Sequence, residues 1–303
     1  MPKRSTLLKW RDALDLKIRT EYRAPVISNY QLAVELVKLM SAGTYVGRSL
    51  RMPARPVDRP LFYKARAALV ESGLLVPSRT LPNTILRFPD RKDSDPAEVH
   101  CTIDPFGHVA YLSAMAFHGL TNRLPRVLYY VTPDASTWSR LASERMDKDL
   151  GELRDAFVTA QLPELRHTVV KRMNGMVIET FRSKDAGGWI HAREGALRVA
   201  SLGRTFLQML QRSDLCGGIR HVIEVYEEHA RLSLKLIVSE LSQRGTKIDR
   251  VRAGYILEEL CGLKDPGIDE WTKDASRGGS RRLDPQAPYA PKFSERWCLS
   301  INV

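Results

Sequence analysis

Residues 58–88 read DRPLFYKARAALVESGLLVPSRTLPNTILRF, and this stretch decides the fold class. Asp58 is suited to cap a helix over 59–72, because its side chain can accept a hydrogen bond from a backbone amide of the first turn. Pro60 fits the first turn of such a helix, and Gly73 ends it. The stretch therefore predicts a helix with a defined start and stop.

Two short strands and two further helices surround this helix. The strands are predicted over 74–76 and 84–88 with a turn-rich connection, so the helix leads into a two-stranded ribbon. Upstream, apolar residues recur at helical spacing over 5–22 and again over 28–41. A loop over 42–58, rich in proline and arginine, precedes the third helix. Three helices followed by a ribbon is the order of a winged helix-turn-helix, in which the third helix enters the major groove of DNA.

The third predicted helix has one polar and one apolar face. At 100° per residue, Arg59, Tyr63 and Arg66 share one face, whereas Phe62 and Ala65 lie about a third of a turn or more away. The polar face is suited to contact base edges or flanking phosphates. An amphipathic core helix with a solvated basic face is the alternative interpretation, and the helix alone does not decide between the two.

Positive charge is concentrated at the N-terminal end of the chain. Residues 1–98 hold 18 Lys and Arg against 10 Asp and Glu, a net charge of +8, whereas 99–303 hold 29 against 25, a net charge of +4. Residues 47–66 alone carry six cations and one acid. Scattered charges usually form a solvated surface, but this density favours binding to nucleic-acid phosphates. The residues expected to contact DNA are Arg48, Arg51, Arg55, Arg59, Tyr63, Lys64, Arg66 and Arg79.

The overall composition is that of an ordinary globular protein. Of the 303 residues, 43% are hydrophobic and 27% are charged, and the formal net charge is +12. No apolar run reaches the ~18 residues that a membrane helix needs, and charges interrupt the opening residues, so neither a membrane span nor a signal peptide is predicted. The four cysteines lie far apart, which favours reduced thiols. We expect a soluble, cytoplasmic protein.

The remainder of the chain is predicted to be a mixed α/β domain. We divide the chain into a winged-helix domain over 1–90, a polar linker over 91–98 and a mixed domain over 99–303, which makes the fold class α+β. Asn174-Gly175 is a strong hairpin signal between two strands. The elements expected in the mixed domain are helix 108–119, strands 126–132, 167–173, 176–182 and 195–200, helices 202–212, 219–230, 231–243 and 247–261, and a closing strand 296–303.

Several residues of the mixed domain are of types found in catalytic, metal-binding or nucleotide-binding sites, but their spacing does not support such a site. Ser113 and His118 are five residues apart on the predicted helix and face different directions, so they do not form a nucleophile–base pair. His221 and His229 are two turns apart, which is too far for one metal ion without other ligands. Gly217-Gly218 lacks the fingerprint of a nucleotide-binding loop. We predict no catalytic, cofactor-binding or metal-binding residues, and therefore no enzyme.

The mixed domain resembles a known family. CTIDPFGHVAYLSAMAFHGL at 101–120, followed by RVLYYVTP, resembles a helix and strand of the AbiEi-type antitoxins of type IV toxin–antitoxin systems. REGALRVASLGRTFLQMLQRSDLCGGIRHVIEV at 193–225 is similar to a further stretch of that family, and SERWCLSINV at 294–303 is similar to its terminal strand. Gln208 stands where the family usually has an acid.

This resemblance implies a two-part antitoxin of an abortive-infection system. The winged helix would bind inverted repeats of double-stranded DNA in the protein's own promoter and repress the operon. The second domain would neutralise a cognate nucleotidyltransferase-like toxin, with direct contact between the two left open. The resemblance implies no cofactor, and a monomer in solution that binds DNA cooperatively.

Two other functions remain as alternatives. A winged-helix transcriptional regulator whose second domain senses a small molecule predicts ligand-dependent operator affinity and no toxin partner. An enzyme that acts on nucleic acid needs clustered carboxylates for a pair of metal ions, and no Asp-x-Asp or comparable cluster lies on a predicted strand.

Overall fold

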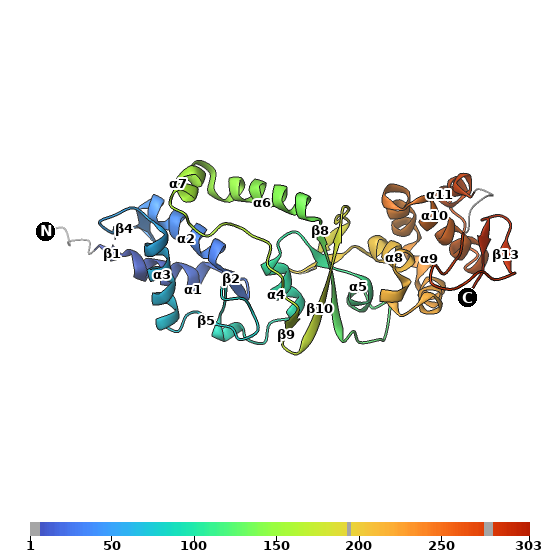
Figure 1. Ribbon diagram of the computed structural model, residues 1–303, viewed down its shortest axis with the longest axis horizontal. Coiled ribbons are helices and arrows are strands. Elements are labelled where there is room, and N and C mark those ends of the chain that lie inside the picture. The colour runs from blue at the N-terminus through green and yellow to red at the C-terminus, as the bar shows by residue number, and fades with distance from the viewer. Residues whose placement is uncertain (1–6, 193–194, 276–280) are drawn as a thin grey trace.

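Three amphipathic helices form the N-terminal unit of the molecule (Figure 1). The computed structural model describes residues 7–192, 195–275 and 281–303. In chain order, the elements of this unit are β1 (Leu8–Lys9), α1 (Trp10–Glu21), β2 (Val26–Ser28), α2 (Asn29–Ala42), β3 (Thr44–Tyr45), β4 (Arg48–Arg51), α3 (Arg59–Glu71), β5 (Val76–Pro77) and β6 (Ile85–Arg87). The strands form two three-stranded sheets, ordered β1-β4-β3 and β2-β6-β5.

The predicted ends of these helices are confirmed by their capping interactions. The Oγ of Ser28 accepts a hydrogen bond from the backbone amide of Gln31, and the Gln31 side chain accepts one from the amide of Ser28, which completes a capping box at the start of α2. Asp58 caps α3 by accepting a hydrogen bond of 2.8 Å from the amide of Leu61. The first helix begins at Trp10, and residues 5–6 of the predicted helix lie outside the described residues.

The segment 42–58, expected to be a loop, contains a β-hairpin instead. Strands β3 and β4 pair antiparallel across a tight turn at Val46 and Gly47, whose φ angles are 48° and 69°. Positive φ at both central residues gives the turn a twist that matches the flanking strands. Leu50 of β4 is buried, and this single apolar residue among arginines gave no alternating pattern from which to predict a strand.

The central unit is a six-stranded mixed sheet with helices around it. Its elements are α4 (Pro96–Ile103), β7 (His108–Val109), α5 (Tyr111–Phe117), β8 (Val127–Pro133), α6 (Ala135–Leu150), α7 (Arg154–Thr159), β9 (Arg172–Met173), β10 (Met176–Ser183), β11 (Trp189–His191) and β12 (Arg198–Ala200). The strand order is β11-β12-β7-β8-β10-β9. Strands β8 and β10 are parallel, with Val127 opposite Val177 and Pro133 opposite Ser183, so their carboxyl ends meet at one edge.

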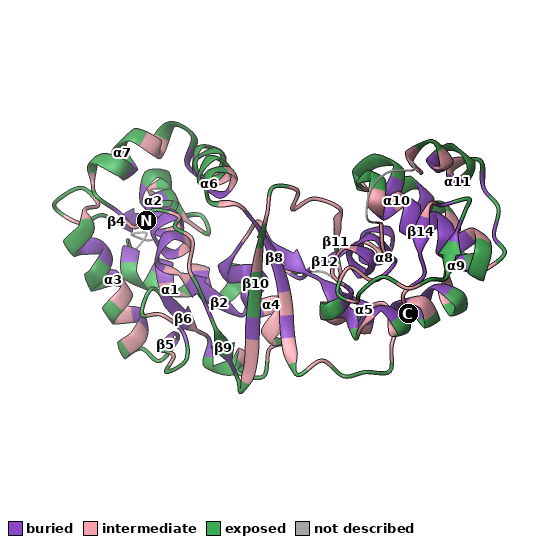
Figure 2. Cartoon of the chain, turned by 45° about the vertical axis from the view of Figure 1, so that its right-hand side comes forward, coloured by how far each residue is buried: buried purple, intermediate pink, exposed green. Residues whose placement is uncertain are grey.

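Helices dominate the C-terminal unit. Its elements are α8 (Leu202–Gln211), α9 (Ile219–Arg244), α10 (Lys247–Gly254), a π-helical segment (Tyr255–Leu260), α11 (Pro266–Trp271), β13 (Phe293–Ser294) and β14 (Leu299–Ser300). Their inner faces form a core around Tyr226 and Trp297, both fully buried, and this core also includes Met115 of α5 and Val131 of β8. Figure 2 shows buried residues in all three units, and the whole chain is a mixed α+β structure.

Helices α6 and α7 extend from the central sheet over the N-terminal unit (Figure 1). Met146 and Leu150 of α6, and Phe157 of α7, belong to the same buried cluster as the helices of the N-terminal unit. The hydroxyl of Tyr30 on α2 donates a hydrogen bond of 2.9 Å to Asp149. The core of the N-terminal unit therefore includes residues from the segment predicted to form the second domain.

Several further elements differ from the sequence predictions. Helices α6 and α7 are not predicted, and the closing strand expected over 296–303 is limited to β14. The segment 108–119 starts as strand β7, because Val109 pairs with both Val199 and Tyr130 in the central sheet. The predicted helices 219–230 and 231–243 are one continuous helix, α9, since no glycine or proline separates them. The expected linker 91–98 overlaps α4, which Asp95 caps by accepting a hydrogen bond from the amide of Ala97.

The hairpin over Asn174-Gly175 is confirmed, with β9 shorter than predicted.

Within the described residues, no helix has the length and apolar character needed to span a membrane.

The docking of α7 predicts a large difference between two adjacent substitutions. Phe157 is 1% exposed and Val158 is 44% exposed. Phe157→Ala should lower the free energy of unfolding by about 3–5 kcal/mol, because it removes buried area and leaves a cavity. Val158→Ala, the matched control, should change it by under about 0.5 kcal/mol. Urea unfolding of both variants provides the measurement, and equal effects would show that α7 does not contribute to the core.

Candidate functional site

Packing of α3 decides which of its side chains reach solvent. Leu61, Phe62, Ala65 and Leu69 are buried on the inner face of the helix. Tyr63 and Lys64 lie on the opposite side and are exposed. The helix therefore presents a narrow polar surface outward, as its sequence predicts.

Arg59 and Tyr63 lie together at the start of this outer surface. The guanidinium carbon of Arg59 is 5.9 Å from the centre of the Tyr63 ring, which is within the range of a cation–π contact. Both side chains line a hollow of about 440 Å³, together with Asn29 at the start of α2 and Thr84 before β6. Parts of α2, α3 and the β5–β6 connection thus converge on one hollow.

Arg66 was predicted to contact DNA, but the structure gives its guanidinium two partners within the protein. The Nε donates a hydrogen bond of 3.0 Å to Oδ1 of Asn29, and Nη2 donates one of 2.7 Å to the backbone oxygen of Asn83. Arg66 is half-buried and joins α3 to the start of α2 and to the β5–β6 connection. These hydrogen bonds connect the three segments.

Of the remaining predicted cations, Lys64 lies on α3 and the others flank the helix. Arg48 and Arg51 are exposed on β4, before α3, and Arg79 is exposed in the connection between β5 and β6, after α3. Arg55 forms an ion pair with Asp58 at 3.8 Å, inside its own segment. Within the described ranges, Arg51, Lys64 and Arg79 form no ion pair and no side-chain hydrogen bond. These side chains are therefore available to an anionic partner.

The far wall of the hollow comes from a segment that the sequence did not connect with α3. Gln161, Glu164 and Arg166, which follow α7, line the same hollow as Arg59 and Tyr63. About one hundred residues of sequence separate the two walls. The only local signal for this docking was the apolar character of residues in and after α7, which does not identify a partner.

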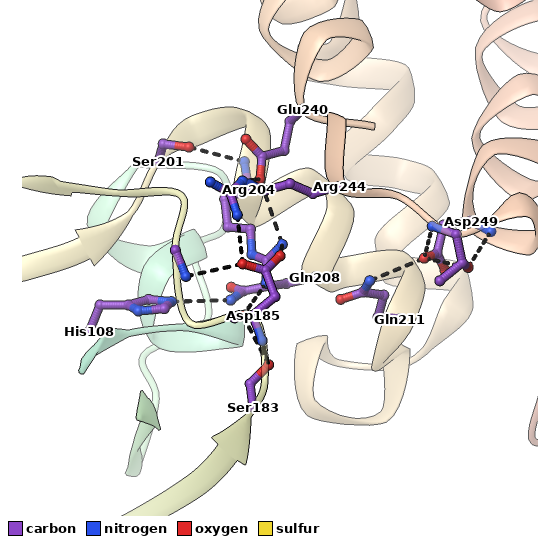
Figure 3. A network of polar contacts seen from close by, with 12 residues as sticks. His108, Ser183, Asp185, Ser201, Arg204, Gln208, Gln211, Glu240, Arg244 and Asp249 are labelled. Carbon is purple, nitrogen blue, oxygen red and sulfur yellow. Dashed lines mark hydrogen bonds and ion pairs between the residues drawn. The ribbon is translucent and has the colours of Figure 1, made fainter. Parts of the chain in front are cut away.

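A second polar cluster joins the central sheet to the C-terminal helices (Figure 3). Asp185, in the connection after β10, accepts hydrogen bonds from Arg204 of α8 at 3.0 Å and from Arg244 of α9 at 2.6 Å. Glu240 of α9 lies 3.6 Å from the Arg204 guanidinium. Burial raises the pKa of Glu240, while Arg204 and Arg244 oppose that shift. The four charges balance, so the cluster serves to connect the two units.

Close approach of the backbone to this cluster requires glycine. Gly188 has a φ of 75°, and a Cβ at this position would lie 2.8 Å from Oε1 of Glu240.

In the same region, Gln208 accepts a hydrogen bond of 3.2 Å from the amide of Tyr111, a non-glycine residue with a φ of 51°. Gln208 therefore has a neutral backbone partner.

The side chains considered for catalysis are engaged with the protein itself. Ser113 donates a hydrogen bond to the backbone oxygen of Val127, and a ring nitrogen of His118 lies 2.7 Å from the backbone oxygen of Ala200. A ring nitrogen of His221 lies 3.0 Å from the hydroxyl of Thr121. In the part of the chain that the structure describes, no three His, Cys, Asp or Glu side chains gather in a group that could hold a metal ion.

Comparisons with known proteins assign no family. No family model matches the chain, and no curated protein matches it. Among solved structures, the chain is similar to the RV2827C protein from Mycobacterium tuberculosis, with a TM-score of 0.49 and 14% sequence identity. The alignment covers 96% of this chain and 90% of that chain. The resemblance to AbiEi-type antitoxins therefore stays a prediction.

Two buried histidines predict a loss of stability in mild acid. Burial lowers the pKa of His108 from 6.5 to about 3 and that of His100 from 6.5 to about 4. Between these values and 6.5 the unfolded chain binds protons that the folded chain does not. The free energy of unfolding should therefore fall as pH is lowered, by about 2 kcal/mol per histidine between roughly pH 7.5 and 5.

Urea unfolding at the two pH values measures this dependence. His108→Asn should remove about 2 kcal/mol of the difference between them, because the titrating group is gone. His191 is exposed, and His191→Asn, the control, should leave the difference unchanged. A His108→Asn variant with the full pH dependence of the parent protein would contradict the assignment.

Proposed function

We propose that the N-terminal unit is a winged helix that binds duplex DNA through the outer surface of α3. In this proposal β5 and β6 form the wing, with Arg79 in the connection that would reach a neighbouring phosphate. The single observation that carries the proposal is the outward placement of Arg59 and Tyr63 on a helix whose other face is buried. Helix, wing and the start of α2 are the parts that contact DNA in helix-turn-helix proteins.

Charge supports a polyanionic partner over an ordinary solvated face. Arg51, Lys64 and Arg79 are exposed around α3 and, within the described ranges, have no acidic partner. Arginine and tyrosine on a helix surface can contact both base edges and phosphates. A protein that neutralises about six phosphates should lose affinity with rising salt, with a slope of log affinity against log salt of roughly −5.

We further propose that the protein is an antitoxin that represses its own promoter and neutralises a nucleotidyltransferase-like toxin. This part rests on the resemblance of 101–120, 193–225 and 294–303 to AbiEi-type antitoxins. The described residues of these stretches belong to the central sheet and the C-terminal helices, except that Ile103 lines the hollow beside Arg59 and Tyr63. In this proposal DNA binding and toxin neutralisation use largely different surfaces of one chain.

Reversing one charge on α3 tests DNA binding. Arg59 is the first residue of α3, where a glutamate is favourable to the helix dipole, so Arg59→Glu should leave the fold intact. The affinity for duplex DNA from upstream of the protein's own reading frame should fall at least about tenfold, because a cation is lost and an anion faces the phosphates. Fluorescence anisotropy at several salt concentrations measures the affinity and the slope.

Arg220 provides a matched control, since it is exposed in the first turn of α9 in the C-terminal unit. Arg220→Glu makes the same change in net charge at the same kind of helix position and should bind DNA within about twofold of the parent protein. If both variants lost the same affinity for DNA, the loss would come from the change in net charge, and the assignment of DNA binding to α3 would be wrong.

Toxin neutralisation should survive the loss of DNA binding. Full-length Arg59→Glu, expressed with the product of the neighbouring gene, should protect cells from that product as well as the parent protein does. A neighbour without toxicity would favour the ligand-sensing regulator, and a toxic neighbour with no rescue by the variant would show that neutralisation needs α3.

A further inference from the structure

A second hollow lies where the parallel strands β8 and β10 end. It has a volume of about 330 Å³ and lies between the inner face of α6 and the segment 164–167, which follows α7. Pro133 and Arg182, at the carboxyl ends of the two strands, contribute to its lining. In α/β sheets the carboxyl ends of parallel strands are a common position for ligand sites.

Three arginines from separate elements line this hollow. Arg154 begins α7, Arg166 lies in the returning segment and Arg182 lies on β10. Among the described residues, Glu164 is the one acid in the lining. Guanidinium groups that converge from different elements are suited to a phosphate, which accepts several charge-assisted hydrogen bonds at once.

The present partners of these arginines are weak competitors for a phosphate. Arg166 lies 3.6 Å from Glu164, and both side chains are well exposed. Arg154 lies 3.2 Å from Asp147, whose side chain is 62% exposed, and its Nη1 donates a hydrogen bond of 3.1 Å to the Sδ of Met146, a weak acceptor. Exposed ion pairs of this kind contribute little free energy. Among the described residues, Arg182 has no ion pair and no side-chain hydrogen bond.

A buried carboxylate holds the wall of the hollow in place. Asp104 is 1% exposed and accepts hydrogen bonds from the hydroxyl of Thr132 at 2.6 Å and from the indole nitrogen of Trp138 at 3.0 Å. The Nε2 of His167 lies 4.0 Å from the same carboxylate, and its ring packs edge-on against Trp138. These contacts fix the end of β8, α6 and the returning segment relative to one another, so the site is preorganised.

We propose that this hollow binds a nucleoside monophosphate. The arginines would hold the phosphate, while Trp138, Met146 and Leu165 supply an apolar wall for the base. Hydroxyl groups of Ser139 and Ser143 on α6 also line the hollow and suit the polar edge of a nucleoside. The volume is near the lower limit of ligand pockets, which favours a mononucleotide over a dinucleotide. Arg166 also lines the hollow beside Arg59 and Tyr63, so its variants are tested with duplex DNA as well as with mononucleotides.

Calorimetric titration of the full-length protein with AMP, GMP, CMP, UMP and inorganic phosphate tests this site. At least one mononucleotide should bind with a Kd below about 1 mM and more tightly than inorganic phosphate. The double variant Arg166→Gln and Arg182→Gln should weaken that binding at least about tenfold, because two charge-assisted contacts are lost. Both side chains are exposed, so the unfolding temperature should stay unchanged.

Arg140→Gln is the matched control, since Arg140 is exposed on α6, pairs with Glu144 and does not line the hollow. It should bind the mononucleotide as the parent protein does. Three results would overturn the proposal: no binding of any mononucleotide to the parent protein, equal affinity for inorganic phosphate, or equal affinity in the double variant. A double variant that loses affinity for duplex DNA but not for mononucleotides would assign these arginines to DNA instead.

Discussion

Burial of the inner face of α3 is the constraint on which the candidate interface depends. Phe62 and Leu69 pack into the N-terminal core, and this packing leaves Arg59 and Tyr63 facing outward. Hydrophobic burial sets the rotation of the helix about its axis, but it does not fix where neighbouring segments lie. Arg66 supplies that second restraint through its hydrogen bonds to Asn29 and Asn83. Arg66, which is half-buried, therefore helps to position α3 relative to α2 and the β5–β6 connection.

Helices α6 and α7, here called the arm, connect the central sheet to the N-terminal unit. Its buried side chains join the N-terminal core, while its first turn lies at the end of β8 in the central sheet. The same arm forms one wall of the hollow beside the three arginines. A ligand in that hollow would contact an element that is packed against the N-terminal unit, and this connection offers a physical route between a bound nucleotide and α3.

Local signals in the sequence predicted several helix ends and one hairpin, but they missed α6, α7 and the β3–β4 hairpin, and they did not predict how the units assemble. The caps at Ser28 and Asp58, and the hairpin over Asn174-Gly175, depend on neighbouring residues, and all three are present in the structure. The hydrogen bonds of Arg66 go to two residues distant in sequence, Asn29 and Asn83, and helical spacing alone does not predict them. The docking of α7 likewise depends on long-range packing that periodicity does not describe.

The central claim is that the outer surface of α3 lies against DNA, and photocrosslinking tests it most directly. Tyr63 is 41% exposed, so a benzoylphenylalanine at position 63 would reach a bound duplex without disturbing the core. The same group at Leu232, which is 94% exposed on α9, reports on a surface remote from α3. The account predicts crosslinks to the upstream duplex from position 63 and none from position 232. Crosslinks from position 232 alone would contradict it.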